Sequence, residues 1–492
     1  MANGRLLLVK ASVPAAVRTI ASPPLGLAAL AAVARERCGF DVSILDTYLE
    51  SDPEAALDAA LRRFEPTVIG LSGLTAERAS LAALAERARR ACPAAPILIG
   101  GPHASADPMD ALTFGSPDAV ITGEGEATLV EVLGRLASRE PLDGTAGAVI
   151  RGGDGSPVVG PERPFIEDLD SLPFPAWDLL AIDRYATLQG MTCVGLRRYM
   201  LLFTSRGCPY RCNYCHDIQG KRFRGASPEY VLGMIDRLVN DFDVHDFDVV
   251  DDIFNWDGPR MERILDGMAA RFPGVRFTLP NGVRCDRLDA AQVDKLARAG
   301  CEHLCLAFET ASPRLQRWTR KHLKIDRVVE VARLAEQRRV FTTGFFMLGF
   351  PTETEAEMRA TIALAARSRL HTAMFFTVTP YAGTGLRDSV DEQRLATFTD
   401  LDRHTARQFS NLSLVPDRTF ASLRAQAYLR FYGDPRRMWR ILRDLPRFNM
   451  LASCLRNLAA IFVRSLATAV ERSMRIAGGG TLPLPAKQSA FG

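Results

Sequence analysis

The sequence predicts an α/β protein with two parallel-sheet domains and a helical C-terminal region. Short apolar runs alternate with helix-like stretches between residues 5 and about 137, and the same alternation returns from about Tyr199 to about residue 380. Strands that alternate with helices form a parallel sheet with the helices on its faces. After about Asp400 the alternation stops and the pattern becomes helical. At 492 residues the chain is long enough for two or three domains, each with its own core.

The composition narrows the class of protein. The net charge is +4 with 24% charged residues, a balance that argues against binding of nucleic acid over the whole surface. Ten cysteines, three of them close together, indicate a reducing compartment and metal chemistry rather than a disulfide framework. The first apolar run, Leu6–Val9, is too short for a signal peptide, and no apolar stretch reaches the ~18 residues of a membrane span. We therefore expect a cytoplasmic protein without a nucleic-acid partner.

Residues 1–145 form the first predicted domain. Strands are expected at Leu6–Val9, Val42–Leu45, Val68–Leu71, Ile97–Ile99 and Ala119–Ile121, and helices around Leu27–Arg37, Glu54–Arg63, Ala76–Ala91 and Glu126–Leu136. This order predicts a doubly wound parallel sheet, whose ligands bind beyond the carboxyl ends of the strands.

Three of those strand ends carry glycines and small polar residues. They are Ser72, Gly73, Leu74 and Thr75; Gly100, Gly101, Pro102 and His103; and Gly123, Glu124, Gly125 and Glu126. Glycines at such places let a large ligand approach the backbone closely. The residues alone do not separate a nucleotide, a flavin and another large cofactor, because no G-x-G-x-x-G follows the first strand.

Residues 146–195 are predicted to join the two domains. The segment begins with a short hairpin of Ala148–Arg151 and Val158–Val159, around a glycine-rich turn. The following stretch, Phe165–Pro175, is rich in prolines and acids and has no periodicity, which is typical of a connector.

Residues 196–390 form the second predicted domain. Strands are expected at Leu201–Thr204, Asp246–Val250, Val275–Leu279, His303–Phe308, Thr342–Leu348 and Ala373–Val378, and helices near Pro228–Asn240, Pro259–Arg271, Ala290–Ala299, Asp326–Arg338 and Glu353–Ser368. Six such units predict an open (β/α)6 barrel with its chemistry at the carboxyl ends of the strands.

A loop with three cysteines follows the first strand of this barrel. Cys208, Cys212 and Cys215 are spaced C-x-x-x-C-x-x-C, one thiolate short of the four that close a structural zinc site or an ordinary iron–sulfur cluster. On a 4Fe–4S cluster this leaves one iron free to bind a small molecule. The alternatives are a zinc knuckle with His216 as fourth ligand, or inert buried thiols. The other close pair, Cys301 and Cys305, lies in a predicted buried strand.

The cysteine loop, with Tyr214 before its third cysteine, resembles the C-x-x-x-C-x-aromatic-C signature of the radical S-adenosylmethionine (SAM) superfamily. The resemblance implies that the three thiolates hold a 4Fe–4S cluster, whose open iron binds SAM and whose electron cleaves it to a 5′-deoxyadenosyl radical. The predicted barrel favours this interpretation over zinc, because a zinc knuckle needs no barrel.

The same resemblance implies contacts to SAM at the later strand ends. The residues concerned are Asp251, Asp252, Arg284, Glu309 and Gly349, with Tyr214 beside the adenine. Arg284 would pair with the SAM carboxylate, and Glu309 would contact the ribose or amino group. The alternative for Glu309 is a carboxylate that is satisfied within the barrel.

The glycine-rich strand ends of the first domain, together with Pro23–Leu27, resemble the cobalamin-binding domain attached to many radical SAM enzymes, here in their class B methyltransferase-like form. The sequence lacks the D-x-H-x-x-G whose histidine ligates cobalt, and His103 is the only histidine in the domain. The resemblance therefore implies cobalamin held without a histidine on cobalt. His103 is expected to touch an edge of the ligand.

Residues 391–476 are predicted to be helical, and residues 477–492 disordered. The expected helices are Phe420–Tyr432, Pro435–Leu445 and Leu451–Met474, and arginines greatly outnumber acids there. Two interpretations remain open: a solvated cap on the barrel, or a basic amphipathic surface that meets anionic lipid or an acidic substrate.

The resemblance implies a cobalamin-dependent radical SAM methyltransferase that methylates an unactivated carbon or phosphorus centre of a small-molecule or lipid-like substrate. An electron donor such as flavodoxin or ferredoxin would serve it. An oxidative cyclase or rearrangement enzyme with the same cofactors is the second hypothesis. A non-catalytic corrinoid or iron–sulfur carrier is the third.

Overall fold

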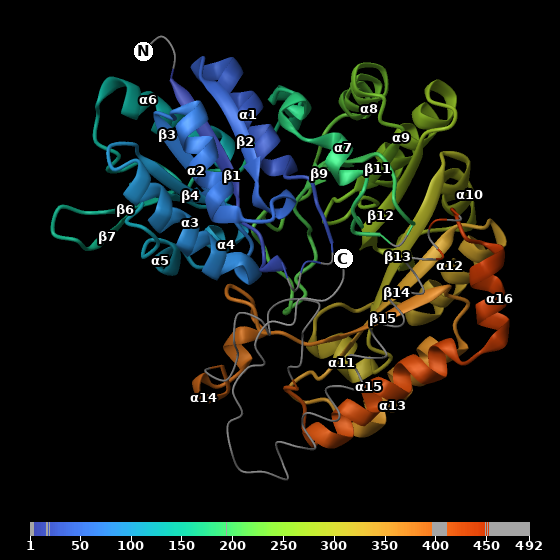
Figure 1. Ribbon diagram of the computed structural model, residues 1–492. Helices are drawn as coiled ribbons and strands as arrows, with labels where there is room; N and C mark the ends of the chain where they lie inside the picture. The colour runs from blue at the N-terminus through green and yellow to red at the C-terminus, as the bar shows by residue number, and fades with distance from the viewer. Residues whose placement is uncertain are drawn as a thin grey trace.

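The computed structural model describes residues 4–395, apart from 16, 17, 19 and 193, together with residues 411–447, 449 and 451. Two sheets covered by helices make up most of the molecule, the first in blue and teal and the second in green to orange (Figure 1). The predicted α/β fold class is confirmed.

The first sheet has the strand order β2-β1-β3-β4-β5-β6-β7, with β1 to β5 parallel. In β1, Leu6 and Leu8 belong to one hydrophobic core and Leu7 and Val9 to another, because successive side chains of a strand point to opposite faces. Both faces are covered, which is why the central stretches of β1, β3 and β4 are apolar. The five parallel strands are β1 (Arg5–Lys10), β2 (Asp41–Asp46), β3 (Val68–Ser72), β4 (Ile97–Gly100) and β5 (Ala119–Ile121).

Four long helices cover this sheet, as predicted. Helices α1 and α6 contribute to one core, and α2 and α3 to the other. Two short helices, α4 and α5, were not predicted from the sequence. The bounds are α1 (Leu25–Cys38), α2 (Pro53–Phe64), α3 (Arg78–Ala91), α4 (Pro102–Ala106), α5 (Pro108–Ala111) and α6 (Gly125–Ser138).

The predicted hairpin is present as β6 (Ala148–Arg151) and β7 (Pro157–Val159). It belongs to the first sheet rather than to the linker, because β6 pairs antiparallel with β5. This pairing covers an edge that β5 would otherwise leave open. The first sheet therefore extends past residue 145, where the predicted domain ended.

The connector after the hairpin has short 3-10 turns and one short helix, α7 (Ile182–Tyr185). Trp177 in this segment is buried and packs near Phe174 and Phe242. Tyr185 donates a hydrogen bond to Asp46 of the first domain at 2.6 Å. The connector is thus packed between the two domains.

The second sheet is entirely parallel, in the order β15-β14-β13-β12-β11-β8. Strands β8 and β15 are its two edges, so the sheet forms the open six-stranded barrel that the sequence predicts. The strands are β8 (Tyr199–Leu202), β11 (Asp246–Val249), β12 (Arg276–Val283), β13 (Cys301–Glu309), β14 (Phe341–Leu348) and β15 (Thr372–Thr377). Cys301 and Cys305 are buried in β13, as predicted.

A helix follows each of the strands β11 to β14, and α8 follows the cysteine loop. The predicted helices are confirmed, and one additional short helix, α11, follows β13. The bounds are α8 (Pro228–Phe242), α9 (Gly258–Arg271), α10 (Ala290–Arg298), α11 (Pro313–Trp318), α12 (Ile325–Gln337) and α13 (Glu355–Arg367). Side chains of Ser227, Asp257, Asp289, Ser312 and Thr354 accept hydrogen bonds from the first turns and define where five of these helices begin.

The C-terminal helices α15 (Asp417–Tyr432) and α16 (Pro435–Arg443), in red in Figure 1, continue from the barrel edge at β15; a short helix, α14 (Glu392–Leu395), precedes them. In α16, Arg437 and Arg440 are buried, whereas Trp439 and Leu442 are exposed. Part of the basic charge is therefore structural rather than solvated. The predicted helix at Leu451–Met474 and the predicted disordered tail lie outside the described residues, Leu451 excepted.

No helix among the described residues is long and apolar enough to cross a membrane.

Candidate functional site

The cysteine loop is closed by two short strands at the carboxyl edge of the second sheet. Strand β9 (Ser205–Arg206) pairs antiparallel with β10 (Arg224–Gly225). Gly207 begins the loop with a φ of 78°, and a Cβ at this position would lie 2.3 Å from the carbonyl oxygen of Arg222. The tight return of the chain at this point therefore requires glycine.

The three predicted metal-binding cysteines share this loop. The backbone N–H of Cys215 donates to the carbonyl of Cys212 at 3.2 Å, and that of Cys208 to the carbonyl of Gly220. Burial raises the pKa of Cys215 to about 12, and the neighbouring thiols of Cys212 and Cys208 add to the increase. Three thiolates on one loop are the donor set of a cluster with one open iron.

His216 is the fourth ligand that the zinc alternative requires. Its Nε2 lies 3.9 Å from the Oδ1 atom of Asp252, and the side chain is half exposed. Within residues 4–395 and 411–447, apart from the gaps given above, no three His, Cys, Asp or Glu side chains, the loop cysteines included, are arranged around a single metal ion.

Asp251 and Asp252 follow β11, as predicted, but their surroundings differ. Asp251 is buried, and its carboxylate accepts hydrogen bonds at 2.6 Å from the backbone and hydroxyl of Thr204 and from Ser205. Asp252 is partly exposed near the cysteine loop, and burial raises its pKa. In this structure, Asp251 anchors the end of β8 and Asp252 remains accessible.

Arg284 directly follows β12, and its guanidinium has partners within the protein. Its guanidinium pairs with Asp286 at 2.7 Å, donates to the carbonyl of Lys321 at 2.7 Å, and lies 4.0 Å from the ring centre of Tyr210. The predicted pairing with the SAM carboxylate stays a prediction, and it would have to compete with these partners.

Glu309, the last residue of β13, accepts hydrogen bonds from two side chains. Lys321 contributes its ammonium at 2.7 Å, and Tyr214 of the cysteine loop its hydroxyl at 3.2 Å. Lys321 was not identified from the sequence, because a single lysine after a short, unpredicted helix gives no periodic signal. The structure thus joins the cysteine loop to the end of β13 and to the segment after α11 (Pro313–Trp318) through one buried carboxylate.

Gly349 directly follows β14 and has a φ of 100°, so glycine is required there. Its N–H donates to Glu353 at 2.6 Å, as does that of Phe350 at 3.2 Å. Burial raises the pKa of Glu353 to about 8 despite these two bonds. Tyr214 packs edge-on against Phe350, so both residues predicted near the adenine lie in one region.

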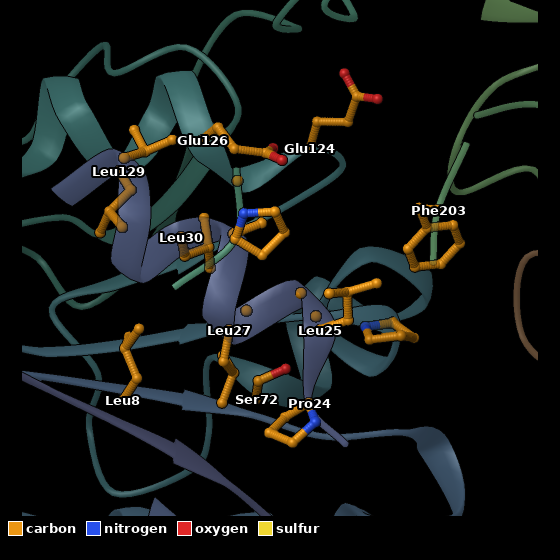
Figure 2. Close-up of a pocket in the computed structure, with 18 of the residues that line it drawn as sticks. Leu8, Pro24, Leu25, Leu27, Leu30, Ser72, Glu124, Glu126, Leu129 and Phe203 are labelled. Atoms are coloured by element: carbon orange, nitrogen blue, oxygen red, sulfur yellow. The ribbon is translucent and has the colours of Figure 1, made fainter. Parts of the chain in front are cut away.

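A cavity of about 400 Å³ opens at the carboxyl ends of the strands in the first sheet. Twelve residues at the strand ends of the first domain were predicted to hold a cofactor. Ten of them line the cavity: Ser72, Gly73, Leu74, Gly100, Gly101, Pro102, Gly123, Glu124, Gly125 and Glu126. Its inner part is apolar, with Leu8, Leu27, Leu30 and Leu129 around it and Phe203 of the second domain on the opposite side (Figure 2). A Cβ added to Gly26 or Gly123 would meet no atom within 4 Å, so these glycines leave room for a large ligand.

Thr75 and His103 are not among the residues that line this cavity, and their contact with a cofactor stays a prediction. His103 is 2% exposed; its Nε2 lies 3.0 Å from the Oδ2 of Asp110, and its ring stacks on Phe114. Burial lowers the pKa of His103, although Asp110 acts to raise it. The side chain is buried behind the loop, because helix α4 begins at Pro102 and turns it away from the strand ends.

Other cavity residues were missed by the sequence analysis. They come from the connector and from the second domain, and include Leu172, Pro173, Trp177, Arg206, Tyr230 and Met234. The connector was identified only as a joining segment, yet it forms a wall of the cavity. Its run of prolines and aromatics within a polar stretch was the available signal.

Comparison with known proteins identifies both halves of the site. Residues 12–133 match the family model of the B12 binding domain, and residues 202–365 match that of the radical SAM superfamily. The chain belongs to the cobalamin-binding radical SAM enzymes. Its cofactors are cobalamin, SAM and a 4Fe–4S cluster.

Relatives of this radical SAM enzyme carry methyltransferase names. It is 28% identical to the uncharacterized methyltransferase PH0819 of Pyrococcus horikoshii, over 88% of this chain and 93% of the relative. It is also 28% identical to the cytidylyl-2-hydroxyethylphosphonate methyltransferase of Streptomyces wedmorensis, over 74% and 77%. The structure of TsrM from Kitasatospora setae with cobalamin and a 4Fe–4S cluster has the same fold, with a TM-score of 0.66 and 18% identity over 80% of this chain and 79% of TsrM.

Proposed function

We propose that this radical SAM enzyme methylates an unactivated carbon or phosphorus centre of a small-molecule or lipid-like substrate. The observation that carries the proposal is the joining of two sites in one chain. A cavity lined by glycine-rich loops of the B12 binding domain lies next to Phe203 and Arg206, which lead into the three-cysteine loop of the barrel. A methyl donor and a radical generator are thereby held beside one another.

When bound, the cluster and SAM supply a 5′-deoxyadenosyl radical, and cobalamin supplies the methyl group. The protein contributes ligands and position. Cys208, Cys212 and Cys215 would hold the cluster, and Asp252 and Glu309 are the strand-end carboxylates best placed to bind SAM. Lys321 balances the charge of Glu309 and fixes its direction.

The cavity supports cobalamin bound without a protein histidine on cobalt. His103 is turned toward Asp110 and Phe114, away from the lining. The apolar inner part, between the sheet and helices α1 and α6, would hold a flat apolar part of the cofactor such as its nucleotide base. Leu27 and Leu129 exclude water from this part, which favours burial of a flat aromatic group.

The experiment is an anaerobic turnover of the reconstituted protein with SAM labelled in its methyl group. The proposal predicts 5′-deoxyadenosine together with a product that gains one labelled methyl. A product that loses hydrogens without a methyl would favour the cyclase or rearrangement hypothesis. Absence of SAM cleavage by cluster-loaded protein would favour a carrier.

Two partners are proposed besides the substrate. An electron donor such as flavodoxin or ferredoxin would reduce the cluster in the cytoplasm. The exposed residues of α16, Arg436, Trp439 and Leu442, combine positive charge with apolar surface, which suits contact with anionic lipid. Cosedimentation with phosphatidylglycerol vesicles tests this contact: wild-type protein should sediment with the vesicles, and Trp439→Ala should do so less. Wild-type protein that stays in the supernatant would mean that the face is merely solvated.

A further inference from the structure

A cluster of four buried charges connects the cobalamin cavity to the cysteine loop. Glu124 and Glu126 follow β5 in the first domain, and Arg206 and Arg224 lie in β9 and β10 of the second. Arg206 pairs with Glu126 at 2.6 Å and with Glu124 at 3.1 Å, and Arg224 pairs with Glu124 at 2.7 Å. Every distance is that of a charge-assisted hydrogen bond or a close ion pair.

Because these four side chains are largely buried, each charge requires its oppositely charged partner. The exposed fractions of the side chains are 8% for Glu124, 7% for Glu126, 17% for Arg206 and 3% for Arg224. A buried charge that loses its partner is strongly unfavourable, so the four groups must keep their arrangement together. Glu124 also accepts a hydrogen bond from the backbone of Ile166 in the connector, which fixes it further.

The position of the two arginines gives this cluster its role. Arg206 and Arg224 are direct partners in the β9–β10 pair, so they mark the two ends of the cysteine loop. Two like charges opposite one another on paired strands repel unless a counter-charge lies between them. Glu124 provides that counter-charge, because it contacts both arginines.

We infer that Glu124 and Glu126 are positioning residues that hold both ends of the cysteine loop against the loop lining the cobalamin cavity, so that cluster assembly and cobalamin binding strengthen each other. This inference rests on the proposed function. An ordered cysteine loop fixes Arg206 and Arg224, which in turn fix the carboxylates beside Gly123 and Gly125. A ligand that finds its site already ordered binds more tightly, and the effect is reciprocal.

The experiment measures the affinity for hydroxocobalamin by anaerobic titration of the full chain in two forms. One is the cluster-loaded protein, and the other is the Cys208→Ala/Cys212→Ala/Cys215→Ala variant without a cluster. The inference predicts that the cluster tightens cobalamin binding roughly tenfold, within the usual range of coupling between sites. Glu126→Gln in both forms should bring the ratio of the two affinities close to one.

Glu131→Gln is the matched control. Glu131 lies on the same helix, α6, and pairs with Arg135 of that helix and with Arg163 after the hairpin, not with the second domain, so the ratio should stay at the wild-type value. A general loss of stability would weaken both affinities and leave their ratio unchanged. Combining Glu126→Gln with Arg206→Met should lower the ratio no further than either change alone.

The outcomes separate the inference from the proposed function. Wild-type protein that binds neither a cluster nor cobalamin would overturn the proposed function. Wild-type protein that binds both, but whose affinity for hydroxocobalamin is the same with and without the cluster, would overturn the inference alone. The same holds if Glu126→Gln keeps the wild-type ratio of these two affinities. If Glu126→Gln does not fold, Arg224→Lys carries the same test, because lysine keeps the charge without the fixed fork of arginine.

Discussion

The strand ends of the two sheets reach their binding roles in opposite ways. In the first domain, glycines such as Gly26 of α1 and Gly123 after β5 line a cavity, and a Cβ at either position would meet no atom within 4 Å. At the strand ends of the second sheet, polar side chains form hydrogen bonds with one another: Asp251 accepts one from Thr204, and Glu309 accepts one from Lys321. Glycines, which have no side chain, shape the site of the first domain. Carboxylates that are paired with neighbouring donors shape the site of the second.

The difference has a physical cause. An apolar cavity without a ligand loses contacts, but it leaves no polar group unsatisfied. A buried carboxylate without a partner costs far more, so it pairs with whatever donor lies nearby. A cofactor that enters the second site must therefore replace or join existing pairs, whereas cobalamin enters a site that is already shaped.

The largest effect is expected at the cysteine loop. Cys212→Ala should abolish the cluster and all formation of 5′-deoxyadenosine, because two thiolates do not hold a 4Fe–4S cluster at the low potential that SAM cleavage needs. Iron content and 5′-deoxyadenosine after anaerobic reconstitution measure this. Cleavage of SAM at the wild-type rate would refute the cluster assignment.

Cys301→Ser and Cys305→Ser are the controls for that experiment. Both thiols are buried in β13, and burial raises the pKa of Cys301 far above its usual value. Their replacement should leave the iron content unchanged. Loss of iron in either variant would place a second metal site in the barrel.

The cavity of the first sheet predicts the next largest effect. Gly26 lies in α1 with open space around its Cβ position, so Gly26→Phe should fill the cavity without straining the helix. We expect the dissociation constant for hydroxocobalamin to rise about a hundredfold or more, the loss of roughly 3 kcal/mol. Iron content should not change. Gly134→Phe, on the exposed side of α6, is the matched control and should bind cobalamin normally.

A smaller effect is expected at the self-paired site of the second sheet. Glu309→Gln removes one charge-assisted hydrogen bond, worth about 1.5 kcal/mol, and should weaken SAM binding roughly tenfold. Equilibrium dialysis of cluster-loaded protein measures it. Glu302→Gln, at the other end of β13 beside Arg447, should leave SAM binding unchanged. An unaltered affinity in Glu309→Gln would make Glu309 a carboxylate satisfied within the barrel.

The pairing of His371 with Asp444 predicts a modest pH effect on stability. Burial lowers the pKa of His371 to about 4, although Asp444 acts to raise it. The neutral ring therefore stabilises the fold fully above pH 6.5, the ordinary pKa, and this contribution is lost as the pH falls toward 4. It amounts to at most about 3 kcal/mol. His371→Gln should show a smaller drop in unfolding midpoint between pH 7.5 and pH 5.

The pH test has to be separated from the titration of other buried groups. Glu353, whose pKa burial raises to about 8, acts in the opposite direction, since its contribution is lost as the pH rises from 4.5 through 8. The informative quantity is therefore the difference between wild type and His371→Gln. An equal drop in His371→Gln would contradict the assignment.

Most of the fold was predictable because both sheets are buried on two faces. Apolar runs such as Leu6–Val9 have no competing interpretation once they alternate with helix patterns, and every predicted strand was found. The pairing of β6 with β5 was not predictable, since a hairpin with its own turn carries no sign of which edge it covers. Helix α11 was missed because six residues are too few for a periodic pattern.

The site was predictable where backbone geometry requires a residue type. The glycines of the first sheet line the cavity as expected. The contact of His103 with Asp110 was not predictable, because its neighbours in the sequence are cavity residues while its own side chain, in the helix beginning at Pro102, lies against Asp110. Lys321 and Trp177 contribute through contacts between distant segments, which a sequence without an alignment does not reveal.

The central claim is that the cavity of the first sheet holds cobalamin with no histidine on cobalt. Electron paramagnetic resonance of the protein loaded with cob(II)alamin tests it most directly. The account predicts a spectrum without the nitrogen superhyperfine splitting of an axial imidazole, and the same spectrum in His103→Ala, because His103 is buried against Asp110 and Phe114. A clear triplet splitting that disappears in His103→Ala would contradict it and place His103 on the metal.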